Sequence, residues 1–360
     1  MIKYLGSKRT LVPVLGRLAE AVEARTALDL FTGTTRVAQE FCRRGAYVTA
    51  VDIARYSEVF ARTYVEPDAA TVDVAAVQAA VDELNALPGT DGYVTETYCH
   101  RSRYFQPHNG RRIDAIRTAI DERWAGTPLW PVLVTSLLEA ADAVDSTVGL
   151  QMAYLKRWSP RSYQELRLAV PEFIPGTGRA VRADAVAVAG ALPPVDLAYL
   201  DPPYNQHRYY TNYHIWETLV RWDEPEVYGV ACKRVDCRDD ATKSPFNGRR
   251  TMSSALASVI GDLRAEVVAV SISDESFVSR AEVERMCRDR AEHVAVLAFD
   301  ARRHIGSVIG VYDGKGRKVG RPGARSTTEY IVLAGDRERL AAIEAAQHEG
   351  QRSESSIVSP

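Results

Sequence analysis

The chain has few cysteines, no long apolar run and almost no net charge. Its five cysteines are scattered through 360 residues, which is not the pattern of a disulfide framework, so reduced thiols are expected. The basic start MIKYLGSKR is not followed by an apolar segment, and no run approaches membrane-spanning length. We therefore expect a cytoplasmic protein without membrane contact. The formal charge of −2 excludes a polycation, so nucleic-acid binding would need local clusters of Lys and Arg.

Metal binding has little support in the sequence. Cys232 and Cys237 lie close together in CKRVDC, but no second Cys or His pair at metal-ligand spacing accompanies them. We assign no metal, and structural zinc remains a minor alternative.

Apolar periodicity predicts an α/β fold. Strand-like runs alternate with helical patterns early in the chain, which is typical of βαβ units in a parallel sheet. Seven strands are predicted, at 27–33, 46–52, 179–184, 195–201, 266–273, 293–301 and 328–335. The last two are joined by a basic loop too short for a crossover helix, which predicts a final hairpin and one antiparallel strand.

The strand pattern is interrupted by a long helical stretch. Residues 66–176 carry helical periodicity and are predicted to form an insertion in an α/β domain made of 1–65 and 177–347. The polar tail 348–360 is expected to be disordered.

The strongest chemical signal is the tetrapeptide Asp201-Pro202-Pro203-Tyr204, which directly follows the apolar run VDLAYL. Ligands of open α/β sheets bind beyond the carboxyl ends of strands. The Asp201 carboxylate and the Pro202 carbonyl can each accept an N–H of an amine on an aromatic ring, which frees the nitrogen lone pair for methyl transfer. Pro203 restricts the turn, and Tyr204 offers a face on which an extruded base can stack. An ordinary Pro-rich turn with a buried tyrosine is the alternative interpretation of this motif.

A second motif follows the first predicted strand. The turn around Gly33 is built from small residues that let a cofactor approach the backbone, and Asp29 can hold an ammonium group. Asp52 ends the next strand, where a carboxylate can accept both hydroxyls of a ribose. The turn has one glycine and is not G-x-G-x-x-G, which disfavours a dinucleotide. The predicted cofactor residues here also include Phe31, Thr34, Thr35 and Ile53.

These motifs and their order resemble the D12 class of N6-adenine DNA methyltransferases, which includes Dam-like and FokI-type enzymes. The resemblance runs from KYLGSK at 3–8 through the D-x-F-x-G turn, an insertion and D-P-P-Y to the strand at 328–334, and it is closest to the FokI-type members. It implies a Rossmann-like, seven-stranded S-adenosylmethionine-dependent methyltransferase sheet with one antiparallel strand. It also implies methyl transfer from S-adenosylmethionine to the N6 amine of a flipped-out adenine.

The resemblance assigns further residues. It places Tyr4, Gly6, Ser7 and Lys8 at the methionine end of the cofactor, with Lys8 as the partner of its carboxylate. It places Asp184 at the cofactor adenine; a helix-capping or solvated aspartate is the alternative there. Two departures stand out. Thr35 replaces a second glycine of the family pattern, and Ser271–Ser276 replaces S-Y-N-x-E-G.

Basic residues cluster at 101–123, 156–167, 233–250 and 302–325. Such runs are usually solvated faces, but aromatic, Gly, Asn and His residues are interleaved here, as in phosphate clamps and base readers. We expect the helical insertion and the loop at 229–252, after the catalytic strand, to form the DNA-recognition surface. The predicted DNA-binding residues are Lys243, Ser244, Arg249, Arg250, Arg111, Arg112 and Asn109.

Three questions stay open at this point. The same D-P-P-Y chemistry suits RNA adenine, and a catalytically silent DNA-binding protein could keep the fold. The expected partner is double-stranded DNA, with a restriction endonuclease or another defence-system protein as a further candidate. The chain is expected to be a monomer or dimer.

Overall fold

The computed structural model describes residues 2–6, 8–302 and 326–357. Its helices are α1 (Val12–Ala21), α2 (Arg36–Arg43), α3 (Arg55–Tyr64), α4 (Val74–Asn85), α5 (Pro107–Trp124), α6 (Leu129–Val144), α7 (Ala185–Val188), α8 (Tyr209–Asn212), α9 (His214–Arg221), α10 (Met252–Asp262), α11 (Arg280–Arg290) and α12 (Arg337–Ile357). Its strands are β1 (Thr26–Leu30), β2 (Tyr47–Asp52), β3 (Gly178–Arg182), β4 (Val195–Leu200), β5 (Val227–Tyr228), β6 (Lys233–Arg234), β7 (Ala265–Ser273), β8 (His293–Arg302) and β9 (Ser326–Gly335).

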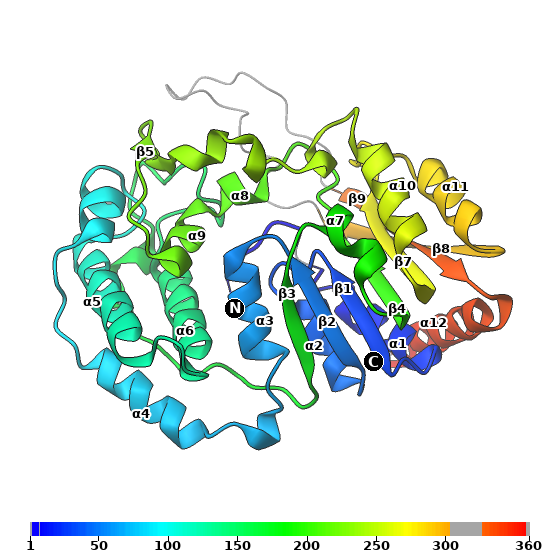
Figure 1. Ribbon diagram of the computed structural model, residues 1–360, viewed down its shortest axis with the longest axis horizontal. Coiled ribbons are helices and arrows are strands. Elements are labelled where there is room, and N and C mark those ends of the chain that lie inside the picture. The colour runs from blue at the N-terminus through cyan, green and yellow to red at the C-terminus, as the bar shows by residue number, and fades with distance from the viewer. Residues whose placement is uncertain (1, 7, 303–325, 358–360) are drawn as a thin grey trace. The chain divides into compact units, whose positions relative to one another are not determined.

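Seven of these strands form one sheet in the order β3-β2-β1-β4-β7-β9-β8 (Figure 1). β2 pairs in parallel with β3, and β4 pairs in parallel with β1 and β7. β9 lies between β7 and β8 and is antiparallel to both. The seven predicted strands and the single antiparallel strand are therefore confirmed. β5 and β6 form a separate two-stranded hairpin that the sequence did not indicate.

Residues 66–144 are mainly helical, residues 145–176 are mostly irregular, and the described structure has no strand within 66–176. α4, α5 and α6 are the longest helices of this segment, and α6 lies next to α9 in Figure 1. The expected disordered tail differs from the structure: residues 348–357 continue α12, and 358–360 lie outside the described residues.

The chain divides into two compact units whose boundaries differ from the predicted insertion. Unit 1 consists of residues 1–12, 31–185 and 208–243, and unit 2 of 13–30, 186–207 and 244–360. In unit 1, one apolar cluster joins Tyr56 of α3, Leu137 of α6 and Trp216 of α9, so the helical segment shares its core with neighbouring elements. In unit 2, β4, β7 and β9 supply the buried core, and β7 is buried over seven consecutive residues.

Local sequence signals explain several element boundaries. The Asp73 carboxylate accepts the Ala76 N–H at the start of α4. Ser279 and Glu282 form a reciprocal capping box at the start of α11. No helix in the described part of the chain is long and apolar enough to cross a bilayer.

Candidate active site

The turn after β1 is held against the end of β2. The N–H groups of Phe31 and Thr32 both donate to the Val51 carbonyl, at 3.0 and 2.9 Å. Phe31 and Gly33 adopt left-handed conformations, with φ of 74° and 52°, so the backbone reverses within three residues. The Gly33 N–H then donates to Asp52 Oδ2 at 2.9 Å. This bond fixes the turn relative to the Asp52 carboxylate.

Asp52 is a half-buried acceptor at the carboxyl end of β2. Its Oδ1 accepts the Ala54 N–H at 2.9 Å, so each carboxylate oxygen holds one backbone donor. Burial raises the pKa of Asp52, and the hydrogen bonds from Ala54 and Gly33 oppose that rise. A carboxylate can accept hydroxyl donors as well as backbone N–H groups. Beside it, Ile53 is 54% exposed and offers an apolar face.

The N-terminal segment is anchored by Tyr209, the first residue of α8, and by Tyr213, which lies between α8 and α9. The Leu5 N–H donates to Tyr213 Oη at 2.6 Å, and Tyr209 Oη donates to the Leu5 carbonyl at 3.1 Å. The Tyr4 ring stacks on Tyr213, with centroids 4.6 Å apart. Gly6 has φ of 73°, and a Cβ there would lie 2.9 Å from Tyr209 Oη. The segment therefore needs glycine at position 6.

Tyr4 also covers the turn after β1. A Cβ on Gly33 would lie 3.0 Å from the Tyr4 ring, so the absence of a side chain lets ring and turn meet. We call the group formed by Tyr4–Gly6, Gly33 and Asp52 the cradle. Lys8 is buried two residues beyond it, and Ser7 lies outside the described residues. The Ala183 N–H donates to the Asp52 carbonyl, so the backbone just before Asp184 joins the end of β2.

Thr35 shows how the chain accommodates its departure from the two-glycine pattern. It is fully buried and left-handed, with φ of 62°, which is strained for a β-branched residue. The Gln39 side chain, one turn into α2, donates to Thr35 Oγ1 at 2.9 Å. Thr34 is also buried. A buried hydrogen bond therefore stabilises a conformation that glycine would adopt without strain.

The D-P-P-Y motif is built within unit 2. β4 pairs with β1 in a register that sets Leu200 opposite Leu30 and Tyr199 opposite Asp29. Asp29 is buried in the sheet, and Asp201 is half-buried at the carboxyl end of β4. Pro202 is buried, and Pro203 and Tyr204 are half-buried. The Tyr204 carbonyl accepts the Phe277 N–H at 2.8 Å, which anchors the loop to the segment after β7.

The segment after D-P-P-Y is hydrogen-bonded to Asn247, which follows the stretch Lys243-Ser244-Pro245-Phe246. Asn247 Nδ2 donates to the carbonyls of Asn205 and His207, at 2.8 and 3.0 Å. We call residues 243–250 the basic loop. Within it, Arg249 and Arg250 are exposed, and the Arg249 guanidinium lies 4.9 Å from the centre of the Phe277 ring. Lys243 pairs with Asp240 at 2.5 Å, and Ser244 Oγ accepts the Phe246 N–H.

The structure corrects the expected role of two residues on α5. Asn109 is fully buried, and its amide binds the Gln164 carbonyl and the Leu166 N–H at 2.9 and 2.8 Å. The Arg112 guanidinium binds the carbonyls of Leu166 and Asn85, at 2.9 and 3.1 Å. These hydrogen bonds hold the helical segment together. Arg111 is exposed and paired with Asp91 at 2.7 Å. The basic cluster at 302–325 lies almost wholly outside the described residues.

Metal coordination has no structural counterpart in the described part of the chain. There, no group of three or more His, Cys, Asp or Glu residues is arranged to hold a metal ion. Cys232 and Cys237 are both buried free thiols.

Comparison with known proteins agrees with the order of these motifs. A family model described as D12 class N6 adenine-specific DNA methyltransferase matches residues 4–251. The chain belongs to this family. The match spans the cradle, the helical segment, D-P-P-Y and the basic loop.

Curated relatives of the D12 chain include three modification enzymes. Modification methylase StsI of Streptococcus sanguinis is 26% identical over 307 residues, covering 80% of this chain and 46% of that protein. Type II methyltransferase M.FokI of Planomicrobium okeanokoites is 26% identical over 312 residues, covering 80% and 47%. The chain thus spans about half the length of these two relatives. Type II methyltransferase M.NlaIII of Neisseria lactamica is 26% identical over 297 residues, covering 78% of this chain and 86% of that protein.

Sequence reasoning did not assign roles to four residues that support the cradle of this D12 chain. Tyr56 Oη lies 3.3 Å from Tyr4 Oη, and Tyr209 and Tyr213 hold Leu5. Glu217 is 3% exposed and accepts the Arg55 N–H at 3.1 Å, at the start of α3. The i, i+4 spacing of Tyr209 and Tyr213 could have indicated that the two rings act together, because residues at this spacing lie on one face of a helix.

Proposed function

We propose that this D12 chain transfers a methyl group from S-adenosylmethionine to the N6 amine of an adenine rotated out of double-stranded DNA. The observation that carries the proposal is the position of D-P-P-Y. It stands at the carboxyl end of β4, beside the carboxyl end of β1, and the turn after β1 leads into the cradle. Ligand chemistry in open α/β sheets is found at such strand ends.

The cradle fits the parts of S-adenosylmethionine. The Asp52 carboxylate suits the ribose hydroxyls, exposed Ile53 suits a flat base, and Gly33 allows close approach to the backbone. The Lys8 ammonium and the Asp29 carboxylate have charges opposite to those of the methionine carboxylate and ammonium. When bound, this cofactor supplies an electrophilic methyl group on a sulfonium.

The D-P-P-Y residues activate the nucleophile. The Asp201 carboxylate and the Pro202 carbonyl each accept one N–H of the adenine amine, which draws the nitrogen lone pair out of conjugation. Pro202 and Pro203 restrict the turn so that this carbonyl keeps its direction. The Tyr204 ring supplies a face for the flipped base.

Duplex DNA is the proposed substrate, and the basic loop is the proposed contact surface. Exposed Arg249 and Arg250 can bind phosphates, with Lys243 and Ser244 beside them in the loop and Arg111 on α5 as a further candidate. The relatives are named as modification enzymes, and a cognate restriction endonuclease is accordingly the proposed functional partner.

The test is methyl transfer by Asp201→Ala beside Asp262→Ala, an exposed carboxylate on α10. Removing one preorganised acceptor should lower turnover by about 10²–10³-fold or more. Tritium transfer from labelled S-adenosylmethionine to unmethylated genomic DNA, RNA and protein measures activity, and calorimetry measures cofactor affinity. We expect Asp201→Ala to lose transfer and keep cofactor affinity, and Asp262→Ala to keep both.

The same assay separates the alternatives. Label in RNA and not in DNA would replace the proposed substrate, and tight duplex binding with no transfer to any acceptor would support a silent DNA-binding protein. Turnover of Asp201→Ala near that of the wild type would place the chemistry elsewhere.

A further inference from the structure

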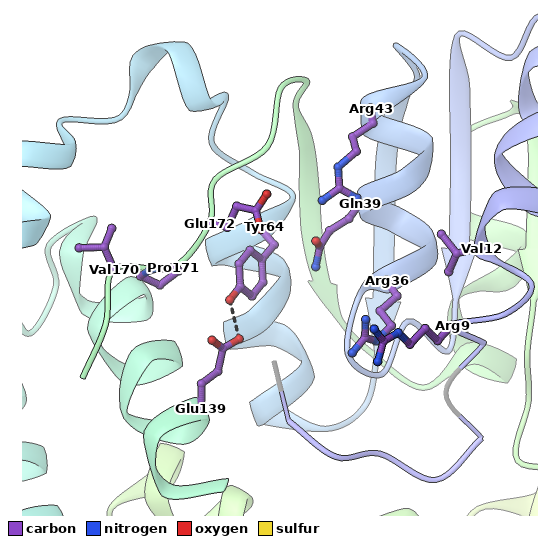
Figure 2. A pocket seen from close by; sticks show the side chains of 10 residues that line it. All are labelled: Arg9, Val12, Arg36, Gln39, Arg43, Tyr64, Glu139, Val170, Pro171 and Glu172. Carbon is purple, nitrogen blue, oxygen red and sulfur yellow. Dashed lines mark hydrogen bonds between the residues drawn. The ribbon is translucent and has the colours of Figure 1, made fainter. Parts of the chain in front are cut away.

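A cavity in unit 1 lies outside the residues assigned to methyl transfer. It has a volume of about 490 Å³ and is lined by α2, the ends of α1 and α3, α6 and the 170–172 segment (Figure 2). Sites for small molecules commonly have about 300–1,000 Å³. The cavity therefore has the size of a metabolite site.

Two arginines on one side of the cavity form no ion pair with a described carboxylate, although the charge of Glu139 acts on Arg36 from across the cavity. Figure 2 shows Arg9 and Arg36 side by side, and among the described residues neither has a carboxylate within ion-pair distance. Arg36 Nε is buried and has no hydrogen-bond partner in the described structure. Burial, followed by the neighbouring charge of Arg9, lowers the pKa of Arg36. Like charges brought together with an unsatisfied buried donor are costly unless an anion joins them.

The other side of the cavity sets limits on the ligand. Tyr64 Oη donates to Glu139 Oε1 at 2.5 Å, as drawn in Figure 2, and Glu172 lies nearby. Carboxylates in the cavity wall repel a long polyanion, and a concave site of this size excludes a duplex. A small molecule with one anionic group can meet the two arginines and direct its neutral hydroxyls toward Glu139.

We propose that this cavity binds a small phosphorylated metabolite, with its phosphate held between Arg9 and Arg36. Guanidinium groups present N–H donors in a planar fork that matches phosphate oxygens, and two such groups supply both charge and geometry. The ligand class is a sugar phosphate or a similar phosphate monoester.

The site is placed to influence the cradle. Arg36 directly follows strained Thr35, and Gln39 both lines the cavity and holds Thr35 Oγ1. Arg9 directly follows Lys8 at the end of the N-terminal segment. A phosphate joining Arg9 to Arg36 would link the two segments that carry Tyr4 and Gly33. Binding of the phosphate and of the cradle ligand should therefore be coupled, and such coupling is reciprocal.

The first test measures binding without activity. Calorimetry and thermal unfolding of the full chain are run with ribose 5-phosphate, inorganic phosphate and, as a control, ribose. We expect saturable binding of the two phosphates and none of ribose. Arg36→Gln and Arg9→Gln should each weaken phosphate binding about tenfold or more, because each removes a charge-assisted contact. The matched control is Arg62→Gln, a half-buried arginine on α3 outside the cavity, which should bind as the wild type does.

Exposed Arg9 keeps the test informative if Arg36→Gln is poorly folded. Absence of saturable phosphate binding to the wild type, or wild-type affinity for phosphate in both variants, would overturn the site. A duplex that displaces ribose 5-phosphate in an Arg36-dependent manner would assign the arginine pair to DNA and overturn the metabolite. None of these outcomes depends on methyl transfer, so the proposed function stands or fails separately.

Discussion

The cradle and the basic loop use polar residues in opposite ways. In the cradle, both oxygens of Asp52 accept backbone N–H groups, and both backbone groups of Leu5 are bound by tyrosines. In the basic loop, the Arg249 and Arg250 side chains are exposed, and Arg249 packs over one ring. The first region is preorganised by hydrogen bonds, and the second presents charge.

This difference predicts how each region responds to change. Where polar groups are mutually satisfied, removal of one leaves others unpaired and alters geometry, so effects should be large and insensitive to salt. Where charge is exposed, effects should be small, spread over all sequences and strongly dependent on salt. Asn109 and Arg112 belong to a basic run in the sequence, but their side chains are hydrogen-bonded within the fold, as the polar groups of the cradle are.

Between these two regions, the largest effect is expected at Asp52. Asp52→Ala removes the acceptor for Gly33 and the proposed acceptor for ribose hydroxyls, and S-adenosylmethionine affinity should fall about 10–100-fold. Asp68→Ala is the matched control, because its Oδ1 also accepts the N–H two residues onward but lies outside the cradle. Calorimetry measures both. Equal cofactor affinity in the two variants would remove Asp52 from the site.

Glu217 tests whether the cradle's support depends on pH. Burial raises the pKa of Glu217 to about 7, against the opposing hydrogen bond from the Arg55 N–H. Because the folded pKa exceeds the unfolded one, this contribution to stability is fully present below the unfolded pKa and is lost as pH rises through about 7. Glu217→Gln keeps an acceptor for Arg55 but does not ionise. Its free energy of unfolding should exceed that of the wild type at high pH, by about 1–3 kcal/mol.

The measurement is urea unfolding of wild type and Glu217→Gln across pH. Glu122→Gln, an exposed carboxylate on α5, is the control and should follow the wild type. A difference between Glu217→Gln and wild type that is the same at pH values below and above the folded pKa would contradict the assignment.

Gly6 tests the contact between the N-terminal segment and Tyr209. Gly6→Ala meets both a left-handed backbone and the Tyr209 hydroxyl, and it should lower the free energy of unfolding by about 1–3 kcal/mol. Gly45→Ala shares the positive φ but meets no atom within 4 Å, so it isolates the cost of the backbone conformation. Thermal unfolding compares them. Equal destabilisation would mean that the contact with Tyr209 adds nothing.

The sequence predicted the strands and the cradle because both rest on local patterns. Apolar runs bounded by turn residues located the sheet, and the carboxyl ends of those runs located Asp52 and Asp201. The support from Tyr209, Tyr213 and Glu217 could not be predicted in the same way. Those contacts join residues that are 162 to 208 positions apart, and a single sequence gives no measure of such proximity.

The basic residues show a different limit. Asn109 and Arg112 look the same in sequence as exposed phosphate contacts, because charge and hydrogen-bonding capacity do not depend on where a side chain lies. Only the fold shows that backbone carbonyls take up their donors. Composition can therefore suggest a phosphate-binding surface, but it does not tell which of the basic residues would form that surface.

The smallest and most widespread effect is expected in the basic loop. Replacing Arg249 and Arg250 with alanine should weaken duplex binding on every sequence, because exposed guanidinium groups contact phosphates without reading bases. The slope of log affinity against log salt should flatten by about one unit for each phosphate that is no longer neutralised. Fluorescence anisotropy across a salt series measures this, with the Arg285 and Arg288 double alanine variant on α11 as control. An unchanged slope with reduced affinity would mean that the two arginines stabilise the conformation of the loop and do not contact phosphates. The basic loop would then resemble the cradle.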